Sequence, residues 1–293
     1  MLLKLKLIGS VEPFANYLKS YARIRESLLL EIDTQKKAFV AKTFTEDHSA
    51  IRFASLSFED ANIVIVSDDG EAERADARIK VGILIQFKKF IQMVERFGSD
   101  VNSEGKCDFE INVSYEPALN KDKKLEYVSS QVQFNSDILK MKMNGFRISE
   151  LTYLSDEVFI NNIFNVSDPV SVRLDSSMIS NIVKTSGIIS VDSRKDALVF
   201  FNEGKILSVC DTFDEKNGPN FVYKIGELDF TPEYPIEIAI NREKFIKMLD
   251  KGDDTYNIII GKYTVNGSNS VDRVLFDSVT SATKIIIAGL KDN

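Results

Sequence analysis

The chain has 293 residues, more than one typical domain, and its 44% hydrophobic content with 20 Phe predicts compact folded structure. Its formal net charge of −7 excludes nonspecific adhesion to nucleic acid through bulk charge, so any DNA contact needs local positive charge. No apolar run reaches the ~20 residues of a membrane-crossing helix, and the amino terminus lacks a signal-peptide core. We therefore expect a cytoplasmic protein, in a bacterium or in an infected host cell.

The amino-terminal half begins with an expected strand at 2–9 and a helix at 12–26. Short runs of β-branched and aromatic residues, separated by turn signals, then predict antiparallel strands. Five strands are expected at 28–33, 38–45, 50–58, 62–69 and 78–84, followed by a helix at 86–98 and strands at 107–115, 127–134 and 138–145. The acidic loop 67–76 and the polar insertion 116–126 receive no assignment.

The carboxy-terminal half repeats this order. Its expected elements are a strand at 170–175, a helix at 176–187, strands at 188–194, 196–204, 205–212, 221–228 and 236–241, a helix at 242–252, and strands at 256–261, 272–279 and 284–290. The repeated order indicates an internal duplication. We expect an α+β protein with one domain at 1–147, a connector at 148–169 and a second domain at 170–293. Cys107 and Cys210, far apart in strand-like segments, are expected to be buried free thiols.

All four expected helices divide into an apolar face and a polar, basic face at ~100° per residue. The four helical segments carry a net charge of +6, so the rest of the chain carries −13. One basic stripe is typical of any solvated helix, but four in an acidic chain favour contact with a polyanion. The cations that we expect to make this contact are Lys19, Arg23, Lys88, Lys89, Arg96, Lys184, Arg242, Lys244, Lys247 and Lys251.

No base-reading motif accompanies these cations. The sequence has no helix-turn-helix, no zinc-ligand spacing and no Trp. Lysines that meet only phosphates give binding that depends on salt and not on base sequence. The pattern therefore predicts contact with the DNA backbone alone.

The order of strand, helix, five strands, helix and three strands, duplicated across a connector, resembles the subunit of a sliding clamp, the DNA polymerase processivity factor. It is similar to the two-domain clamps, which are proliferating cell nuclear antigen and the clamps of T4-like phages. The stretch "INREKFIKMLDKGDDTYNIIIG" carries most of the resemblance, and the end "AGLKDN" is similar to the tail of that family. The resemblance implies two clamp-type domains, each with a pair of antiparallel meander sheets and two helices on one face.

The resemblance also implies the assembly and the partners. Subunits would form a homotrimeric ring around double-stranded DNA, with the basic helix faces inward and strand 138–145 of one subunit against 205–212 of the next. DNA polymerase and a clamp loader would be partners, and no cofactor or metal is implied. The residues expected in a pocket for partner peptides are Leu151, Tyr153, Phe159, Ile160, Tyr234, Pro235, Ile287 and Leu290; each could equally pack the connector onto a sheet.

An enzyme is the less favoured interpretation. His48, the only histidine, lies between Asp47 and Ser49 in a segment typical of a surface turn, and Ser-His-Asp chemistry would depend on it alone. The phosphate-cradling pattern G-x-x-x-x-G-K-[ST] is absent. We therefore expect no catalytic residues. The alternative that stays open is a structural or scaffold protein, such as a viral particle component, with a duplicated β-rich fold and no DNA encirclement.

Overall fold

The computed structural model describes residues 1–70, 78–82, 87–119, 123–144, 167–189, 196–211, 218–233, 235–249, 254–265 and 269–290. The chain divides into two compact units, unit 1 with residues 1–43 and 53–157 and unit 2 with residues 44–52 and 158–293. Most of the expected connector 148–169 lies outside the described residues. None of the described helices has the length and apolarity that a membrane span requires.

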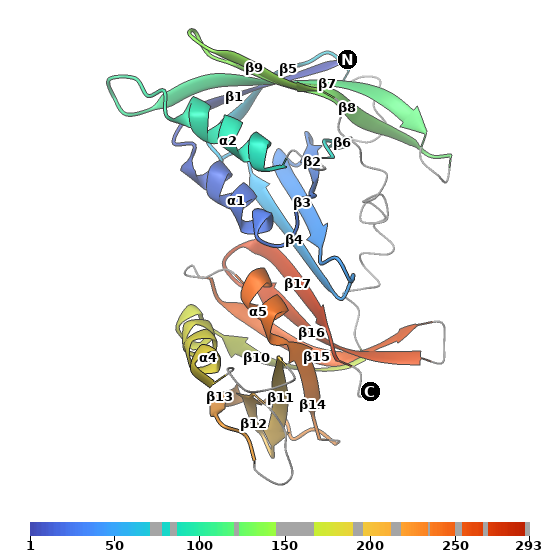
Figure 1. Cartoon of the computed structure of the whole chain (residues 1–293). Coiled ribbons are helices and arrows are strands. Elements are labelled where there is room, and N and C mark those ends of the chain that lie inside the picture. The colour runs from blue at the N-terminus through green and yellow to red at the C-terminus, as the bar shows by residue number, and fades with distance from the viewer. Residues whose placement is uncertain are drawn as a thin grey trace. The chain divides into compact units, whose positions relative to one another are not determined.

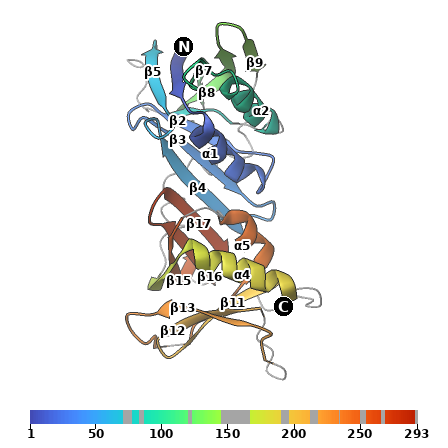
Figure 2. The ribbon, with the colours of Figure 1, turned by 90° about the vertical axis from the view of Figure 1, so that its left-hand side faces the viewer.

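Unit 1 contains two helices that lie next to each other on one side of its strands (Figure 1, Figure 2). Its strands pair in the order β4-β3-β2-β6-β8-β7-β1-β5, with β9 also beside β8. The elements are β1 (Leu2–Gly9), α1 (Glu12–Ala22), β2 (Leu29–Asp33), β3 (Ala38–Phe44), β4 (Ala50–Ser57), β5 (Ile63–Asp68), β6 (Arg78–Lys80), α2 (Phe87–Gly98), β7 (Cys107–Leu119), β8 (Leu125–Asn135) and β9 (Lys140–Asn144).

Unit 2 has two sheets, one in the order β10-β15-β16-β17 and one in the order β13-β12-β11-β14. Helices α4 and α5 lie together on one side of these strands (Figure 2). The elements are β10 (Ser167–Leu174), α4 (Ser176–Ile189), β11 (Ala197–Glu203), β12 (Ile206–Cys210), β13 (Val222–Glu227), β14 (Glu237–Asn241), α5 (Arg242–Met248), β15 (Tyr256–Val265), β16 (Asn269–Ser278) and β17 (Ala282–Ala288).

The alternation of apolar and charged residues explains why one face of a strand such as β1 is buried. In β1, Leu3, Leu5 and Leu7 are fully buried, while Lys4 and Lys6 lie on the opposite, more exposed face. Because successive strand residues point to opposite faces, this period of two places one face on the core of unit 1. The α+β class expected from the sequence is confirmed.

The duplication is also visible in the packing. Strands β10, β15, β16 and β17 repeat the pairing order of β1, β7, β8 and β9. Phe134 of β8 contacts Phe90 of α2 at 5.6 Å between ring centroids, and Phe276 of β16 contacts Phe245 of α5 at 5.8 Å. Both strand rings are fully buried. The second helix of each unit therefore packs on the same strand through an aromatic pair.

Two expected boundaries in unit 2 are wrong. The strand expected at 188–194 does not begin at residue 188, because α4 continues through Ile189, and residues 190–194 lie outside the described residues. Gly187 does not adopt a positive φ, so it does not act as the helix-ending residue that its position suggests. Helix α5 ends at Met248 instead of residue 252, because Leu249 turns to extended backbone at φ −84° and ψ 134°. Met248 and Leu249 are both buried, and this bend lets both reach the core.

The expected open edge at 205–212 is also wrong. Strand β12 pairs with β11 on one side and with β13 on the other. Among the described strands, β13 and β14 are the outer strands of this sheet, and β9 pairs only with β8. The described residues of the insertion 116–126, unassigned from the sequence, extend strands β7 and β8, since Pro117 pairs with Tyr127 and Leu119 with Leu125.

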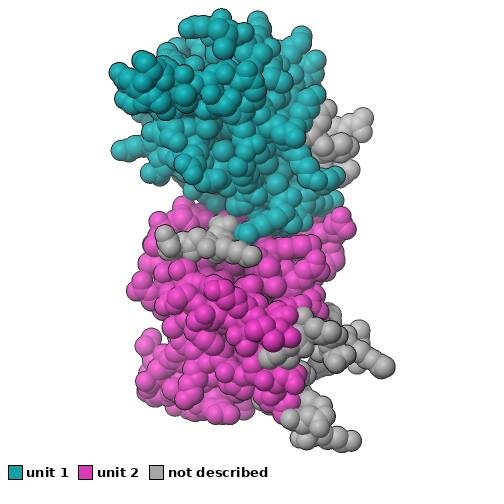
Figure 3. Space-filling model, turned by 60° about the vertical axis from the view of Figure 1, so that its left-hand side comes forward, with its two compact units in different colours: residues 1–43, 53–157 teal, residues 44–52, 158–293 magenta. Residues whose placement is uncertain are grey.

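The segment 44–52 was not expected in unit 2. It contains the turn between β3 and β4 and is grouped with unit 2 by its contacts. Figure 3 colours the two units on one face of the molecule. Arg52, which is 2% exposed, donates from Nη1 to the carbonyl oxygen of Met248 at the end of α5. This turn is therefore part of the surroundings of α5.

Candidate nucleic-acid interface

The four helices have the two-faced character expected from the sequence. In α2, Phe87, Phe90, Ile91, Val94 and Phe97 are buried, whereas Lys88, Lys89, Gln92 and Arg96 are exposed. In α1, Phe14, Leu18 and Tyr21 are buried, whereas Asn16 and Lys19 are exposed. Lys184 is exposed on α4, opposite the buried Ile179 and Ile182. Arg23 is exposed one residue beyond the end of α1.

Two of the helices begin at well-formed caps. The Asp175 carboxylate accepts hydrogen bonds from Ser177 Oγ at 2.6 Å and from the backbone N–H of Met178 at 2.8 Å. The hydrogen bond from Ser177 is the main cause that lowers the pKa of Asp175. At α5, Asn241 Oδ1 accepts the backbone N–H of Lys244 at 3.0 Å. These caps fix where α4 and α5 begin and hence which side chains face solvent.

Ion pairs hold three of the expected cations in unit 1. Lys19 of α1 lies 2.6 Å from Glu95 of α2, Lys88 lies 3.0 Å from Glu26, and Arg96 lies 2.6 Å from Asp100. Side chains in these pairs are between 24% and 72% exposed. Such exposed pairs contribute at most about 1 kcal/mol, so a phosphate can compete for these cations. The pairs lower the positive charge of the helix faces without removing it.

The cations of α5 are held more firmly. The guanidinium of Arg242 pairs with Asp196 and donates to the backbone oxygen of Ser186 at 3.1 Å. Lys244 Nζ pairs with Asp47 and donates to Ser49. The Arg242 and Lys244 side chains are each only 17% exposed. Both residues therefore tie α5 to neighbouring segments and offer little charge to a ligand.

Three of the expected cations are the most accessible to a DNA phosphate. Lys247, 43% exposed, pairs with Glu243 on the same helix at 2.6 Å. Lys89 and Lys184 have no ion pair among the described residues. Lys251 lies outside the described residues. The sequence did not reveal which cations are paired, because Asp47 and Asp196 are distant in sequence from their partners.

Solved structures with the same arrangement of elements include both archaeal and bacterial proteins. A chain of the PCNA2-PCNA3 complex from Sulfolobus tokodaii matches 98% of this chain over 98% of its own length, with a TM-score of 0.53 and 10% identity. PCNA of A. fulgidus was solved with the C-terminal region of FEN-1 bound. The alignment covers 99% of this chain and 99% of that PCNA chain, with a TM-score of 0.56 and 10% identity. The DNA polymerase III beta chain of Streptococcus pneumoniae gives a TM-score of 0.60 at 14% identity.

The chain has the sliding-clamp fold. It spans about two thirds of the bacterial beta chain, 66% of that length, but nearly the whole of each PCNA chain. No protein-family model matches the sequence, and no curated protein sequence matches it. The similarity is therefore one of fold at low sequence identity.

Only part of the expected peptide pocket of this clamp fold can be placed. Leu151, Tyr153, Phe159, Ile160 and Tyr234 lie outside the described residues. Pro235 is exposed in the segment before β14, and Leu290 is 43% exposed after β17. Ile287 is fully buried in β17. Of these three, Pro235 and Leu290 are accessible to a docked peptide.

The histidine and the two cysteines, the side chains that could act in catalysis or bind a metal, each have a place in the packing of the fold. His48 adopts φ +59° in the β3–β4 turn, and its ring packs edge-on against Phe44 with centroids 4.4 Å apart. In the part of the chain that the structure describes, Cys107 and Cys210 are buried and form no disulfide, as expected. Within the described residues, no cluster of three or more His, Cys, Asp or Glu side chains could hold a metal ion.

Proposed function

We propose that this protein is a sliding clamp, a ring that encircles double-stranded DNA and tethers a DNA polymerase for processive synthesis. The observation that supports the proposal most is the match of the entire chain to PCNA chains over nearly their entire length. The exposed lysines on all four helices supply the second support, because a ring that slides needs weak, sequence-independent phosphate contacts. The protein would act in the cytoplasm, as a processivity factor and not as an enzyme.

A homotrimer is the assembly that fits the length of the chain. Two units per subunit give six similar units in a trimer, and the outer strands β9 and β13 supply one open edge on each unit. Pairing β9 of one subunit with β13 of the next would leave neither edge exposed. The polymerase and a clamp loader would bind the outer surface.

Two measurements test this function. Light scattering coupled to size exclusion should give three times the chain mass of 33.0 kDa. Protein loaded on circular DNA by a clamp loader should stay bound through a high-salt wash and leave after the DNA is linearised. Loss of the protein from intact circles in the wash would contradict encirclement.

The alternative, a scaffold protein without DNA encirclement, is separated by the same experiment. A scaffold can form a trimer, but it has no reason to stay on circular DNA and to leave linear DNA. Release upon cutting is therefore the decisive readout, and mass alone is not.

A further inference from the structure

Strand β5 forms an outer edge of unit 1. It pairs antiparallel with β1, with Leu5 opposite Ile65 and Leu7 opposite Ile63, and β1 is its only partner among the described strands. Figure 2 shows β5 at the margin of the sheet, near the start of the chain. The proposed ring uses the edges of β9 and β13, so it leaves the edge of β5 open.

The backbone of β5 offers hydrogen bonds at this edge. The N–H of Ile8 donates to the Asn62 oxygen at 2.9 Å, so Asn62 directs its carbonyl to β1. Because the backbone groups of successive strand residues point to opposite edges, Ile63 and Ile65 direct theirs away from β1. The N–H of Ile63 donates to the Phe58 oxygen at 2.7 Å, whereas no described backbone group bonds to Ile65 on that side. Ile65 therefore presents a donor and an acceptor to a further strand.

Exposed apolar side chains accompany the open edge. Val64 and Val66 of β5 are 50% and 52% exposed, and Ile8 of β1 is 49% exposed. Val64 pairs with Lys6, and Ile8, two residues after Lys6, lies on the same face of β1. Lys6 is itself held by Asp108 at 3.0 Å. Exposed β-branched residues on an outer strand form a surface that another strand can pair with and cover.

The charge around β5 is acidic. Glu59 and Asp60 precede the strand and Asp69 follows it. All three side chains are exposed, and none of them forms an ion pair with another described residue. In the sequence, residues 59–76 contain seven acidic residues and one basic residue. On β1, Lys4 adds one nearby cation, so the surroundings of the edge remain strongly negative.

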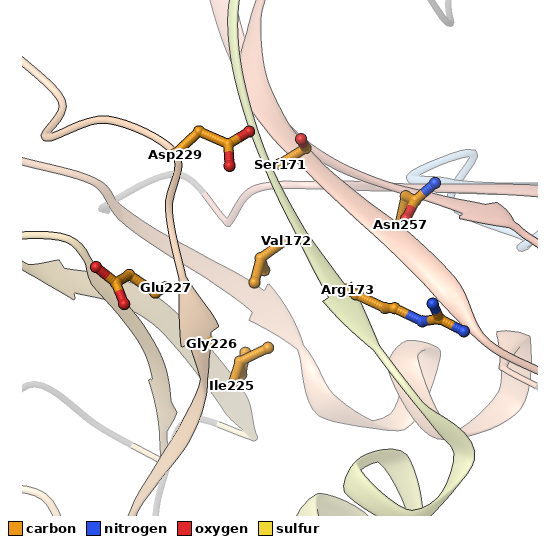
Figure 4. A pocket seen from close by; sticks show the side chains of 8 residues that line it. All are labelled: Ser171, Val172, Arg173, Ile225, Gly226, Glu227, Asp229 and Asn257. Atoms are coloured by element: carbon orange, nitrogen blue, oxygen red, sulfur yellow. The ribbon is translucent and has the colours of Figure 1, made fainter.

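Unit 2 has no such edge at the corresponding strand among its described elements. Strand β10 takes the place of β1 and pairs with β15 on one side. Strand β13 flanks its other side, where Ile225 and Gly226 lie beside Val172 (Figure 4). A Cβ at Gly226 would lie 2.5 Å from Val172 Cγ2, so the two strands approach closely. The open edge beside the first strand is therefore a property of unit 1.

We propose that the open edge of β5 binds an extended, basic segment of a partner protein, which adds to the sheet of unit 1 as a further strand. Main-chain hydrogen bonds to Ile65 supply affinity, and alternate apolar side chains of the segment cover Val64 and Val66. Lysine or arginine side chains at the two ends of the segment face the carboxylates before and after β5.

The same carboxylates disfavour a second copy of this chain at the edge. Two β5 strands paired antiparallel would bring Glu59 and Asp60 of one copy close to Asp69 of the other. Like charges that face each other across a strand pair are destabilising, and charged residues at sheet edges commonly prevent such self-association. A basic segment is attracted at the same positions. The charge pattern therefore favours a different protein as the occupant.

Fluorescence anisotropy on the full-length protein tests the proposal. The probe is a short, labelled peptide in which alternating valine and threonine residues lie between two pairs of lysines. We expect saturable binding, and hydrogen exchange at Ile65 should slow when the peptide is bound, because its N–H then bonds to the peptide. Val64→Thr with Val66→Thr should weaken binding at least fivefold. Val101→Thr with Val279→Thr, valines 55% and 50% exposed outside β5, is the matched control and should leave binding unchanged.

A second pair of variants tests the charges. Glu59→Gln with Asp60→Asn removes two carboxylates and keeps side-chain oxygens that accept hydrogen bonds. We expect at least threefold weaker binding and a smaller effect of salt on the affinity. Glu203→Gln with Glu237→Gln, exposed carboxylates on β11 and β14, is the control and should leave both unchanged.

Three results would overturn the proposal. They are equal binding of a peptide with glutamate in place of lysine, equal binding of a peptide N-methylated at every residue between the lysine pairs, and unchanged exchange at Ile65. The exchange measurement uses the unmodified protein, so it decides the question even where a variant fails to fold. None of these results depends on whether the protein forms a ring.

Discussion

Lys244 of α5 and Asp47 of the β3–β4 turn form an ion pair within unit 2, although 197 positions separate them in the chain. Thr45 and Ser49 also donate hydrogen bonds to the Asp47 carboxylate. Burial acts to raise the pKa of Asp47, but the hydrogen bonds from Lys244, Thr45 and Ser49 outweigh it and hold the pKa well below its usual value. The lysine that the sequence offers as a DNA contact is therefore a link between a turn and a helix.

This ion pair predicts a pH-dependent loss of stability in Asp47→Asn. At pH 7 the variant should lose about 1 kcal/mol of unfolding free energy, the upper end for an exposed ion pair, because Lys244 is mostly buried. A carboxylate with a lowered pKa contributes stability above the unfolded-state pKa, near 3.9, and loses it as the pH falls through the folded-state pKa. Thermal unfolding from pH 7 to pH 3 should show the difference persisting at pH 5 and shrinking below pH 4. A constant difference across this range would contradict the assignment.

The spacing of apolar residues along the sequence was sufficient to predict the buried and exposed faces of the helices and the positions of most strands, because burial within one element follows that spacing. Lys88, Lys89 and Arg96 are exposed where the 3.6-residue period places them. The end of α5 was missed because the adjacent apolar residues Met248 and Leu249 also fit a helix that continues, as the buried neighbours Phe90 and Ile91 do in α2. Local spacing does not specify which segments meet across the fold.

Which strands are neighbours and which charged residues pair depend on contacts between segments that are distant in sequence. Whether β12 or β13 ends its sheet depends on the order in which the strands pair, and the local residue pattern of a strand does not specify that order. Asp47 lies in a turn that joins unit 2 from the amino-terminal half. The low sequence identity to known clamps leaves no residue pattern from which such partners could be inferred.

The exposed lysines should control DNA affinity. Lys89→Ala combined with Lys184→Ala removes cations without ion pairs among the described residues, so folding should be unchanged. The slope of log K against log salt for duplex DNA should fall by about 0.9 for each phosphate that the variant no longer neutralises. Lys36→Ala with Lys106→Ala, exposed lysines outside the helices, is the control and should keep the slope. Equal slopes for both variants would contradict a helix-lined interface.

The open edge of β9 should be needed for the proposed ring. The N–H groups of adjacent strand residues point to opposite edges of the strand. Of the two variants Lys140→Pro and Met141→Pro, one therefore removes an N–H from the open edge of β9 and the other removes an N–H that faces β8. The variant that loses the open-edge N–H should give a chain-sized mass in light scattering while its circular dichroism matches the parent. Val66→Pro and Ser67→Pro provide the control on β5, which is an outer strand of unit 1. A trimer that survives both β9 variants would exclude this edge.

Asp175 should stabilise the first turn of α4. Asp175→Ala removes the acceptor of the Met178 N–H and the Ser177 hydroxyl, and loss of such a cap costs about 1 kcal/mol. Asp175→Asn keeps a side-chain oxygen and should cost much less. Because the pKa of Asp175 is lowered, the charged cap contributes above about pH 4 and is lost as the pH falls through that lowered value. Hydrogen exchange of the α4 amides should be about fivefold faster in the alanine variant at pH 7, whereas equal rates in both variants would show that the carboxylate does not cap the helix.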